Sequence, residues 1–526
     1  MAVPSRGPNG DLARQWARRR TFILLNVWAQ VILALLLVIL VNAIAGMTPQ
    51  TRAWCLDLTG TGRHRISSKT RNILRNLKGP LRIYVVAGDG LARLASDRRV
   101  RVPVMERLQD TLGLYEAESR RVNVRFLDYD RDKQAILDLQ LALNDTVPAN
   151  SIIVRSGTRH ETVPFDGLIL EPEEPATLGA RAQVAFDIEG RVTEAISRVT
   201  EEHRAVVYVL SGYDGFGVTE DDPYVLREFA QSLRRENYDL RVLRRGTFQE
   251  VPKDCDVLLV VAPAREFAAG EIEAIRRYLD AGGGLFCLMR PRIYSRANAD
   301  LAALWNSFGC AALDDRLVYE WHETTTPGQR RAEPQVLATH YGSHPITDDL
   351  RTMRVRADFA VPLMTLHEAA AFQTSLPGPR PARNENVVPL IFSSDQSWGE
   401  DNFREPKKDP SDLPGPCAIA LAAEGPKGDA TGMRAPRMVL SGSCAMVLDE
   451  VLKNPDCFAN RIFALNAMGW LARRDYKLGI PPQRSDIRPV RLTIRTERVV
   501  FYVTAVLMPL TAALGGAFTW WRRRSG

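Results

Sequence analysis

Residues 271–289 read EIEAIRRYLDAGGGLFCLM, and this stretch decides the fold that the sequence predicts. Residues 271–279 read as a helix, and the apolar run at 285–289 reads as a buried strand. Between them, Gly282 to Gly284 supply the left-handed cap and the tight turn that release a helix into a strand. A glycine cradle for phosphate needs the opposite order, with the glycines after a strand and before a helix. We therefore interpret these glycines as part of an α/β unit and not as a phosphate site.

The same alternation of strands and helices continues on the N-terminal side of this stretch. Residues 205–212 (AVVYVLSG), 239–243 and 257–264 (VLLVVAPA) read as strands because they are rich in β-branched side chains. A helix is expected at 224–233. The order strand, helix, strand, strand, helix, strand is typical of an open, doubly wound sheet whose strands are mostly parallel.

An earlier region predicts another α/β unit. Residues 81–87 (LRIYVVA) and 122–127 read as strands, and a helix near 104–116 separates them. Ser67 or Ser68 can cap a further helix that precedes the first strand. The alternation favours parallel pairing of the two strands.

Two long uncharged runs lie near the ends of the chain. Residues 21–45 contain 25 residues without a charge, and residues 499–521 contain 23. A helix needs roughly 20 apolar residues to cross a bilayer, so we expect both runs to span a membrane. Four arginines precede the first run and three follow the second, which places both termini in the cytoplasm by the positive-inside rule. A cleaved signal peptide is the alternative for the first run, but the run is longer than a typical signal sequence.

The expected fold class is α/β, with a membrane-anchored ectodomain of two or three domains that each contain an open, mostly parallel sheet. The expected location is the cytoplasmic (inner) membrane, with two spans in the lipid bilayer and the main domain on the periplasmic side. The expected boundaries are a basic tail at 1–20, a transmembrane helix at 21–45, a first α/β domain at 46–201, a second, amidotransferase-like α/β domain at 202–373, a loop or linker at 374–415, closing strands and a helix at 416–498, a transmembrane helix at 499–521 and a basic tail at 522–526.

The composition is that of an ordinary globular protein. Charged residues make up 25% and hydrophobic residues 45% of the chain, which argues against disorder. The arginines beside the two uncharged runs account for the formal net charge of +7, so the middle of the chain need not be basic. A basic stripe with interleaved aromatic residues is absent from the sequence, and nucleic acid is therefore not an expected partner.

The cysteines and histidines do not form a metal motif. The seven cysteines are Cys55, Cys255, Cys287, Cys310, Cys417, Cys444 and Cys457. None is part of a CxxC pair, which argues against a zinc ribbon or a thioredoxin motif, and the connectivity of any disulfides stays open. His340 and His344 are four residues apart, as helical metal ligands can be, but Gly342 and Pro345 break any helix there. We expect no metal and no cofactor.

The sequence contains no catalytic motif of the common kinds. The GxSxG elbow, HExxH and Walker A patterns are all absent. Cys287 follows a glycine turn on a strand, in the manner of the nucleophile of a glutamine-amidotransferase-like sheet. That chemistry needs small residues around the cysteine and a histidine base, whereas Phe286 and Leu288 flank this one. We therefore assign no catalytic residue and expect no enzyme activity.

An acidic loop follows the strand expected at 205–212. Tyr213, Asp214, Asp221 and Asp222 lie at the carboxyl end of this strand, which is the edge where doubly wound sheets bind ligands. A solvated surface loop is the commoner explanation for such residues. These four side chains are the candidate ligand-binding residues of the chain.

Several short motifs resemble the GldG family. They are Leu77-Lys78-Gly79-Pro80-Leu81-Arg82-Ile83-Tyr84, residues 186–200 (FDIEGRVTEAISRVT), Tyr278-Leu279-x-x-Gly282-Gly283, His344-Pro345-Ile346, and Asn460, Asn466, Trp470 and Leu471 in a closing helix at 458–471. The family often reads Gly-His-Gly-Glu where this chain reads Gly212-Tyr213-Asp214-Gly215. No role of the family's histidine is therefore transferred to this chain.

GldG-like proteins are auxiliary subunits of ABC-2-type transporters and were first associated with gliding motility. The resemblance implies a non-catalytic, substrate-binding or scaffolding subunit beside an ABC-2-type permease and a separate ATPase. Its ligand would be an exported substrate or an envelope polymer. Two alternatives stay open, namely a membrane-anchored envelope scaffold or glycan-binding protein without an ATPase partner, and a degenerate amidotransferase-like hydrolase.

Overall fold

The structure is a computed structural model, and it describes most of the chain between residues 66 and 479. The described residues are 66–88, 98–170, 185–201, 203–219, 222, 224–295, 297–324, 329–372, 386–425 and 434–479. The chain divides into two units, one of residues 1–168 and 187–483 and the other of residues 169–186 and 484–526. In the smaller unit, the described residues form two short antiparallel strands, β5 (Ile169–Leu170) and β6 (Ala185–Phe186). The remaining elements below belong to the larger unit.

The first part of the larger unit is a four-stranded sheet. Its elements are α3 (Ser68–Arg75), β1 (Leu81–Ala87), α5 (Arg98–Glu118), β2 (Val122–Asp128), α6 (Lys133–Leu143), β3 (Ser151–Ser156), β4 (Arg159–Pro164) and α7 (Ile188–Thr200). The strands lie in the order β2-β1-β3-β4. The β1–β2 pair is parallel, as the sequence predicts, whereas β3 and β4 run antiparallel to their neighbours.

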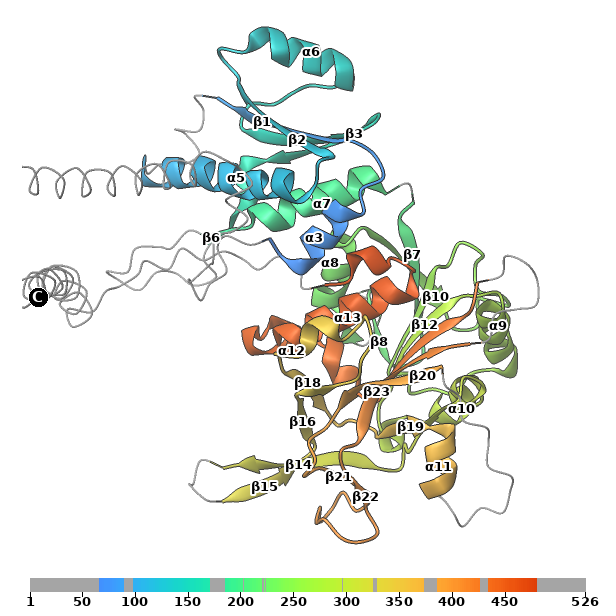
Figure 1. The fold of residues 1–526 in the computed structure, drawn as a ribbon. Coiled ribbons are helices and arrows are strands. Elements are labelled where there is room, and N and C mark those ends of the chain that lie inside the picture. Colours follow the sequence, from blue (N-terminus) through green and yellow to red (C-terminus); the bar gives the residue numbers. More distant parts are fainter. Residues whose placement is uncertain are drawn as a thin grey trace, which may run out of the picture. The chain divides into compact units, whose positions relative to one another are not determined.

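Helices cover both faces of this sheet. On one face, Ile136 and Leu139 of α6 pack against Val86 and Ile153 of the strands. On the other face lie α5 and α7 (Figure 1). The sheet is therefore the middle layer of three.

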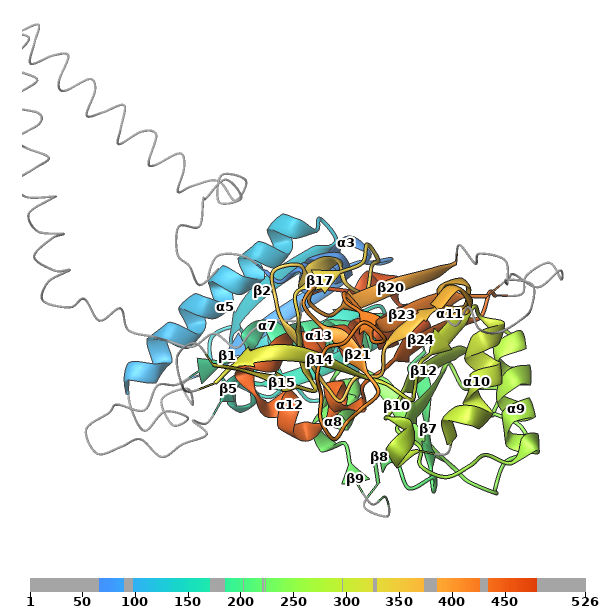
Figure 2. The ribbon, with the colours of Figure 1, turned by 90° about the horizontal axis from the view of Figure 1, so that it is seen from below.

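The second part is built on a ten-stranded sheet. Its elements are β7 (Ala205–Ser211), α8 (Arg227–Arg235), β10 (Tyr238–Arg244), β11 (Val257–Val261), α9 (Ala269–Asp280), β12 (Gly284–Leu288), α10 (Ala297–Ser307), β13 (Cys310–Ala312), β17 (His340–Tyr341), β19 (Leu363–Thr365), α11 (Leu366–Phe372), β20 (Val387–Phe392), β23 (Ala418–Glu424), β24 (Arg437–Ser441), α12 (Asp449–Lys453) and α13 (Phe458–Leu471). The order is β10-β7-β11-β12-β24-β23-β19-β13, with β20 and β17 on a side branch from β23. Two hydrophobic cores lie on its faces. Phe229 of α8 and Phe463 of α13 belong to one core, and Ile275 of α9 and Leu304 of α10 belong to the other (Figure 2).

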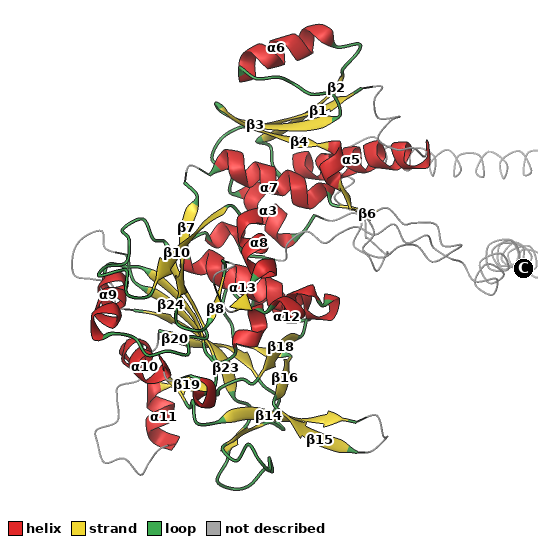
Figure 3. Cartoon of the chain, turned by 180° about the vertical axis from the view of Figure 1, so that it is seen from behind, coloured by secondary structure: helices red, strands yellow, loops and turns green. Residues whose placement is uncertain are grey.

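Smaller elements complete the described part. β14 (Leu317–Glu323), β15 (Arg330–Glu333), β21 (Trp398–Glu400) and β22 (Leu413–Pro414) form a sheet in the order β15-β14-β21-β22. Figure 3 labels two of these strands, β14 and β15. β16 (Gln335–Ala338) pairs with β18 (Val355–Asp358), and β8 (Phe216–Gly217) pairs with β9 (Tyr224–Val225). The short 3₁₀ turns are η1 (Phe165–Leu168), η2 (Arg292–Tyr294), η3 (Asp348–Leu350), η4 (Cys444–Val447), η5 (Pro455–Cys457) and η6 (Asp475–Lys477).

Two of the motifs quoted above meet in the core around α13. The ring of His344 packs edge-on against Trp470, with centroids 5.0 Å apart. The buried side chain of Asn466 donates to the carbonyl oxygen of Ile346 at 3.1 Å. Asn460 makes two hydrogen bonds with the main chain of Arg356, at 2.9 and 2.7 Å. These motif residues therefore satisfy buried backbone groups, which explains their residue types without a ligand.

The expectation of mostly parallel sheets needs correction. Only β10, β7, β11, β12 and β24 are mutually parallel, and the other strands of the large sheet pair antiparallel. β23 is buried along nearly its whole length, so its sequence lacks the polar alternation that usually marks an antiparallel strand. Within residues 374–415, expected as a loop or linker, the structure has β20, β21 and β22. The structure is thus a mixed α/β fold.

The expected membrane helices and the two-span inner-membrane location also need correction. Across the ranges that the structure describes, no helix is both long enough and apolar enough to cross a bilayer. The largely buried helix α13, for example, has 14 residues and is only about 21 Å long. The stretches expected to span, 21–45 and 499–521, lie outside the described residues.

Candidate functional site

The large sheet reverses its strand order between β7 and β11. The chain passes from β7 to β10 on one side and then returns to place β11 on the other side. Such a reversal separates the loops that leave the two carboxyl ends, and open α/β sheets bind ligands in the resulting crevice. Ala262, directly after β11, has a φ of 46°, which is uncommon outside glycine and asparagine. The candidate site is therefore the carboxyl edge of β7 and β11.

Tyr213 holds the loop after β7 against the sheet. Its buried ring stacks on Phe267, with centroids 4.2 Å apart, and the guanidinium of Arg245 lies 5.7 Å above the ring. Its carbonyl oxygen accepts hydrogen bonds from the amides of Ala264 and Arg265, at 2.8 and 3.1 Å. Burial, together with the negative charge of Glu271, raises the pKa of Tyr213, so the phenol is neutral. Tyr213 thus fixes the loop after β7 to the loop after β11.

Asp214 faces an arginine of the neighbouring loop. Its half-exposed carboxylate forms an ion pair of 2.5 Å with Arg265, and its carbonyl oxygen accepts a hydrogen bond from Arg290 at 2.9 Å. Its φ of 52° is in the left-handed region, which aspartate tolerates better than most residues. The carboxylate therefore has a positive partner already in place.

Asp222 is buried and bonded within its own loop. It accepts hydrogen bonds from the hydroxyl of Ser211 and from the amide and hydroxyl of Thr219, the last two at 3.1 and 2.7 Å. Asp221 lies outside the described residues. Tyr213, Asp214 and Asp222 therefore make contacts that stabilise this loop, and their role in binding a ligand stays a prediction.

A hollow of about 460 Å³ lies beside this loop. Its walls are Phe216, Asp222, Tyr224, Val225, Leu226, Arg227, Leu448, Asp449 and Glu450. The rings of Phe216 and Tyr224 lie 5.0 Å apart, and Tyr224 is 55% exposed. Asp449 accepts a hydrogen bond at 3.0 Å from the amide of Glu228, which lies in the first turn of α8. The neighbouring Glu450 is exposed. Sequence reasoning missed the residues of α12 because they follow those of the loop by more than 200 positions.

The thiols of the sheet are unsuited to nucleophilic chemistry. Cys287 is the fourth residue of β12 and is 2% exposed, and burial raises the pKa of its thiol to about 12. Within the described residues its sulfur has no hydrogen bond to a histidine, which such a nucleophile needs. All six described cysteines are free thiols, and Cys55 lies outside the described residues.

His340 and His344 do not form a helical pair. His340 is in the short strand β17, and His344 lies in the turn that follows. The Nδ1 of His344 accepts a hydrogen bond from the amide of Ile346 at 3.2 Å. The two histidines therefore do not lie one turn apart on a helix, as a helical pair of metal ligands would.

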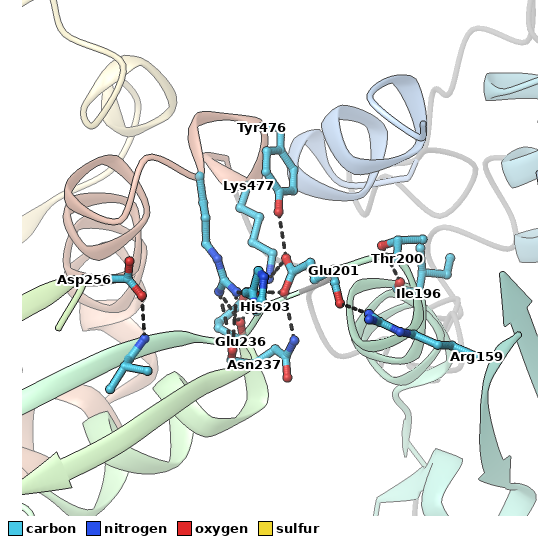
Figure 4. Close-up of polar contacts among 12 residues, drawn as sticks. Arg159, Ile196, Thr200, Glu201, His203, Glu236, Asn237, Asp256, Tyr476 and Lys477 are labelled. Atoms are coloured by element: carbon cyan, nitrogen blue, oxygen red, sulfur yellow. Dashed lines mark hydrogen bonds and ion pairs between the residues drawn. The ribbon is translucent and has the colours of Figure 1, made fainter. Parts of the chain in front are cut away.

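A buried group of charges lies at the opposite, amino end of β7 and β10. We call it the junction cluster, and it consists of Lys69, Glu201, Glu236, Arg474 and Lys477. Figure 4 labels three of these residues, Glu201, Glu236 and Lys477. Glu201 pairs with Lys477 at 2.5 Å and with Arg474 at 2.9 Å. It also accepts hydrogen bonds from Tyr476 at 2.9 Å and from Asn237 at 2.8 Å.

The junction cluster connects the two sheets of the larger unit. Lys69 belongs to α3, beside the four-stranded sheet, and pairs at 2.5 Å with Glu236, the C-cap residue of α8. Burial raises the pKa of Glu236, but the positive charges of Lys69 and Lys477 outweigh that effect and lower it. The carboxylate of Glu236 is therefore ionised, and the cluster holds four separate chain segments together.

The comparison with protein families gives a match in the middle of the chain. Residues 204–317 match the family model ABC_transp_aux, described as "ABC-type uncharacterized transport system". The matched segment runs from β7 through β13 and includes the strand reversal. The match supports an auxiliary component of an ABC-type transport system. It does not single out the GldG family, and no curated protein matches the chain.

Similarities to solved structures are weak. The mmIFT52 N-terminal domain is 16% identical, with a TM-score of 0.36, and the match covers 51% of this chain and 97% of that one. A thua-like protein from Bacteroides uniformis is 16% identical, with a TM-score of 0.28, covering 51% and 91%. A glutamine amidotransferase from Thermotoga maritima is 10% identical, with a TM-score of 0.27, covering 52% and 99%. At these TM-scores the similarities support no statement about function.

Proposed function

We propose that this chain is a non-catalytic, ligand-binding auxiliary component of an ABC-2-type transport system, working with a separate permease and a separate ATPase. One observation carries the proposal. The segment that matches the transport-system family, residues 204–317, is the segment that builds the strand reversal and one wall of the hollow beside it. The family match supports the transport context, and the position of the hollow supports ligand binding.

The hollow determines what kind of ligand we propose. Tyr224 offers an exposed aromatic face, Arg227 an exposed guanidinium, and Glu450 an exposed carboxylate. Aromatic faces contact apolar ligand surfaces, while carboxylates accept hydrogen bonds from hydroxyl or amino groups. The proposed ligand is therefore a polar molecule with donor groups and one apolar face, which suits an exported substrate or an envelope polymer.

The ligand half of the proposal is tested by native mass spectrometry of the purified full-length protein. The wild type is compared with Tyr224→Ala and with Tyr294→Ala, because both tyrosines are 55% exposed and only Tyr224 lines the hollow. We expect a bound molecule on the wild type and on Tyr294→Ala, and its loss from Tyr224→Ala. Equal retention by both variants would show that the hollow is not the site.

The transport half is tested by purifying the tagged protein in mild detergent and identifying its partners. A stoichiometric ATPase and a multi-span permease support the transport role. A chain that binds an envelope polymer but purifies without an ATPase instead fits a scaffold or glycan-binding protein. Turnover that depends on Cys287 would revive the hydrolase interpretation, against its burial and raised pKa.

A further inference from the structure

Three carboxylates converge where β21 ends. Glu400 is the last residue of β21, Asp401 follows it, and Asp412 directly precedes β22. One carboxylate oxygen of each residue lies within 4.8 Å of one from the other two. The three residues thus bring together the two ends of the loop at 401–412.

Glu400 is held in place by hydrogen-bond donors. It is 1% exposed and accepts hydrogen bonds from the indole of Trp398 at 3.0 Å and from the amides of Asn402 and Lys407 at 2.8 and 2.9 Å. These donors hold both oxygens of the Glu400 carboxylate in fixed positions.

Asp412 has a buried carboxylate oxygen without a hydrogen-bond partner among the described residues. The residue is 6% exposed, and its Oδ2 accepts a hydrogen bond from the amide of Asp409 at 2.7 Å. Its other oxygen, Oδ1, is buried and has no hydrogen-bond partner among the described residues. Its ion-pair partner among the described residues, Nη1 of Arg316, is 3.8 Å away, which is too long for a hydrogen bond. A buried carboxylate oxygen left in this state is costly unless a cation binds it.

The charge of the group is not balanced by its arginine. Arg316 pairs with Asp401 at 3.1 Å and donates to the carbonyl oxygen of Gly399 at 3.1 Å. Lys408 is directed elsewhere, to the carbonyl oxygens of Gln396 and Ser397. Three carboxylates against one guanidinium leave a net charge of −2 when all are ionised, which is the charge that one divalent cation neutralises.

We propose that Glu400, Asp401 and Asp412 bind one divalent cation and that this cation is Ca²⁺. Hard oxygen ligands are what Ca²⁺ prefers, and its bonds of about 2.3–2.6 Å allow ligand oxygens up to about 5 Å apart. The irregular set of one strand residue and two loop residues suits the flexible coordination of Ca²⁺ better than the strict octahedron of Mg²⁺. The bound ion joins the two ends of the loop at 401–412 and so orders it. This inference does not depend on the proposed transport role.

Terbium luminescence tests the site, because Tb³⁺ replaces Ca²⁺ and is sensitised by a nearby indole. Trp398 donates directly to Glu400, so Tb³⁺ in the site lies close to a sensitiser. The full-length protein is first freed of metal with a chelator and then titrated with Tb³⁺, followed by competition with Ca²⁺ and Mg²⁺. We expect sensitised emission that Ca²⁺ abolishes at lower concentration than Mg²⁺, and a rise in Tm on adding Ca²⁺ alone.

Three variants locate the emission. Asp401→Asn removes the exposed ligand with little risk to folding, and Asp412→Asn removes the buried one. Glu405→Gln is the matched control, because Glu405 is an exposed carboxylate of the same loop outside the group. We expect at least a tenfold weaker Tb³⁺ affinity for both aspartate variants and no change for Glu405→Gln. Absent emission from the wild type, or equal weakening by Asp401→Asn and Glu405→Gln, overturns the site, and stronger competition by Mg²⁺ overturns the assignment to Ca²⁺.

Discussion

The hydroxyl of Ser211, the last residue of β7, donates a hydrogen bond to the carboxylate of Asp222, which lies 11 residues further along the chain. The bond folds the acidic loop back onto the strand from which it leaves. Asp222 is therefore used in closing the loop, while Tyr224, two residues later, is left exposed at the hollow. The carboxylate of Asp222 thus bonds within the loop, while Tyr224 stays exposed.

Replacing Asp222 with alanine is expected to lower the free energy of unfolding by about 1–3 kcal/mol, because the partly buried donors of Ser211 and Thr219 lose their acceptor. Asp214→Ala breaks an exposed ion pair with Arg265 and is expected to change it by no more than about 1 kcal/mol. Urea unfolding of the two variants, followed by circular dichroism, measures the difference. Equal effects would contradict the structural role of Asp222.

The junction cluster is expected to depend on Glu201. Glu201→Gln leaves Arg474 and Lys477 buried with one fewer negative partner, and we expect a loss of about 3–5 kcal/mol of stability. The double variant Glu201→Gln, Lys477→Met removes one of the two cations that lost a negative partner and should recover part of the lost stability. Urea unfolding of both variants measures the coupling, and a double variant that is no more stable than Glu201→Gln argues against it.

The pH dependence of stability reports on Lys477. Burial, reinforced by the positive charge of Arg474, lowers the pKa of Lys477 from 10.5 to about 8 in the folded protein. Between pH 8 and 10.5 the unfolded chain therefore binds this proton and the folded chain does not, so the contribution of Lys477 to stability rises with pH. The rise amounts to about 3 kcal/mol and is absent below pH 8.

The comparison of the wild type with Lys477→Met isolates this contribution, because all other titrating groups are common to both. The difference in the free energy of unfolding should be constant from pH 6 to 8 and should increase from pH 8 to 10.5 in favour of the wild type. A difference that stays constant over the whole range, or that falls above pH 8, would contradict the lowered pKa.

Cys287 is expected to be unreactive in the folded protein. Its pKa of about 12 leaves almost no thiolate at pH 8, and the side chain is 2% exposed. Iodoacetamide at pH 8, followed by peptide mass spectrometry, should label Cys287 only after denaturation. Rapid labelling of the native protein at this residue would reopen the nucleophile interpretation.

The turn after α9 is expected to tolerate no side chain at Gly283. A Cβ there would lie 2.4 Å from the ring of Tyr278, whose hydroxyl bonds the amide and carbonyl of Gly284 at 3.0 and 2.9 Å. Gly283→Ala should lower the free energy of unfolding by about 1–3 kcal/mol, since the ring must move. Gly270→Ala, in the open first turn of the same helix, is the control and should raise it by up to about 1 kcal/mol. A loss smaller than about 0.5 kcal/mol for Gly283→Ala would contradict the packing described, because changes of that size are typical of surface substitutions.

The parallel half of the fold was predictable because its signals are local. β1 coincides with the expected strand at 81–87, α13 with the expected helix at 458–471, and β12 begins one residue before the expected strand at 285–289. Each has a run of apolar residues bounded by a glycine, a proline or a helix cap, and such signals lie within a few residues of one another. The antiparallel half depends on pairings between distant segments, such as β19 with β13 and β20 with β23, and the sequence does not encode these locally.

The candidate site was predictable only in part for the same reason. The rule for carboxyl edges indicated the loop after β7, whose role as a ligand site stays a prediction, and it could not show that Asp222 bonds Ser211 or that Asp214 pairs with Arg265. Glu450 and Lys477 acquire their surroundings from segments more than 200 residues away. Long-range burial and charge compensation therefore needed the structure.

The central claim, an auxiliary role in an ABC-type transport system, is tested most directly by the partners of the protein. The tagged full-length chain is purified in mild detergent, with and without gentle crosslinking, and the associated proteins are quantified by mass spectrometry. We expect an ATPase and a multi-span permease to purify with the chain in stoichiometric amounts. A chain that purifies alone, even after crosslinking, would contradict it.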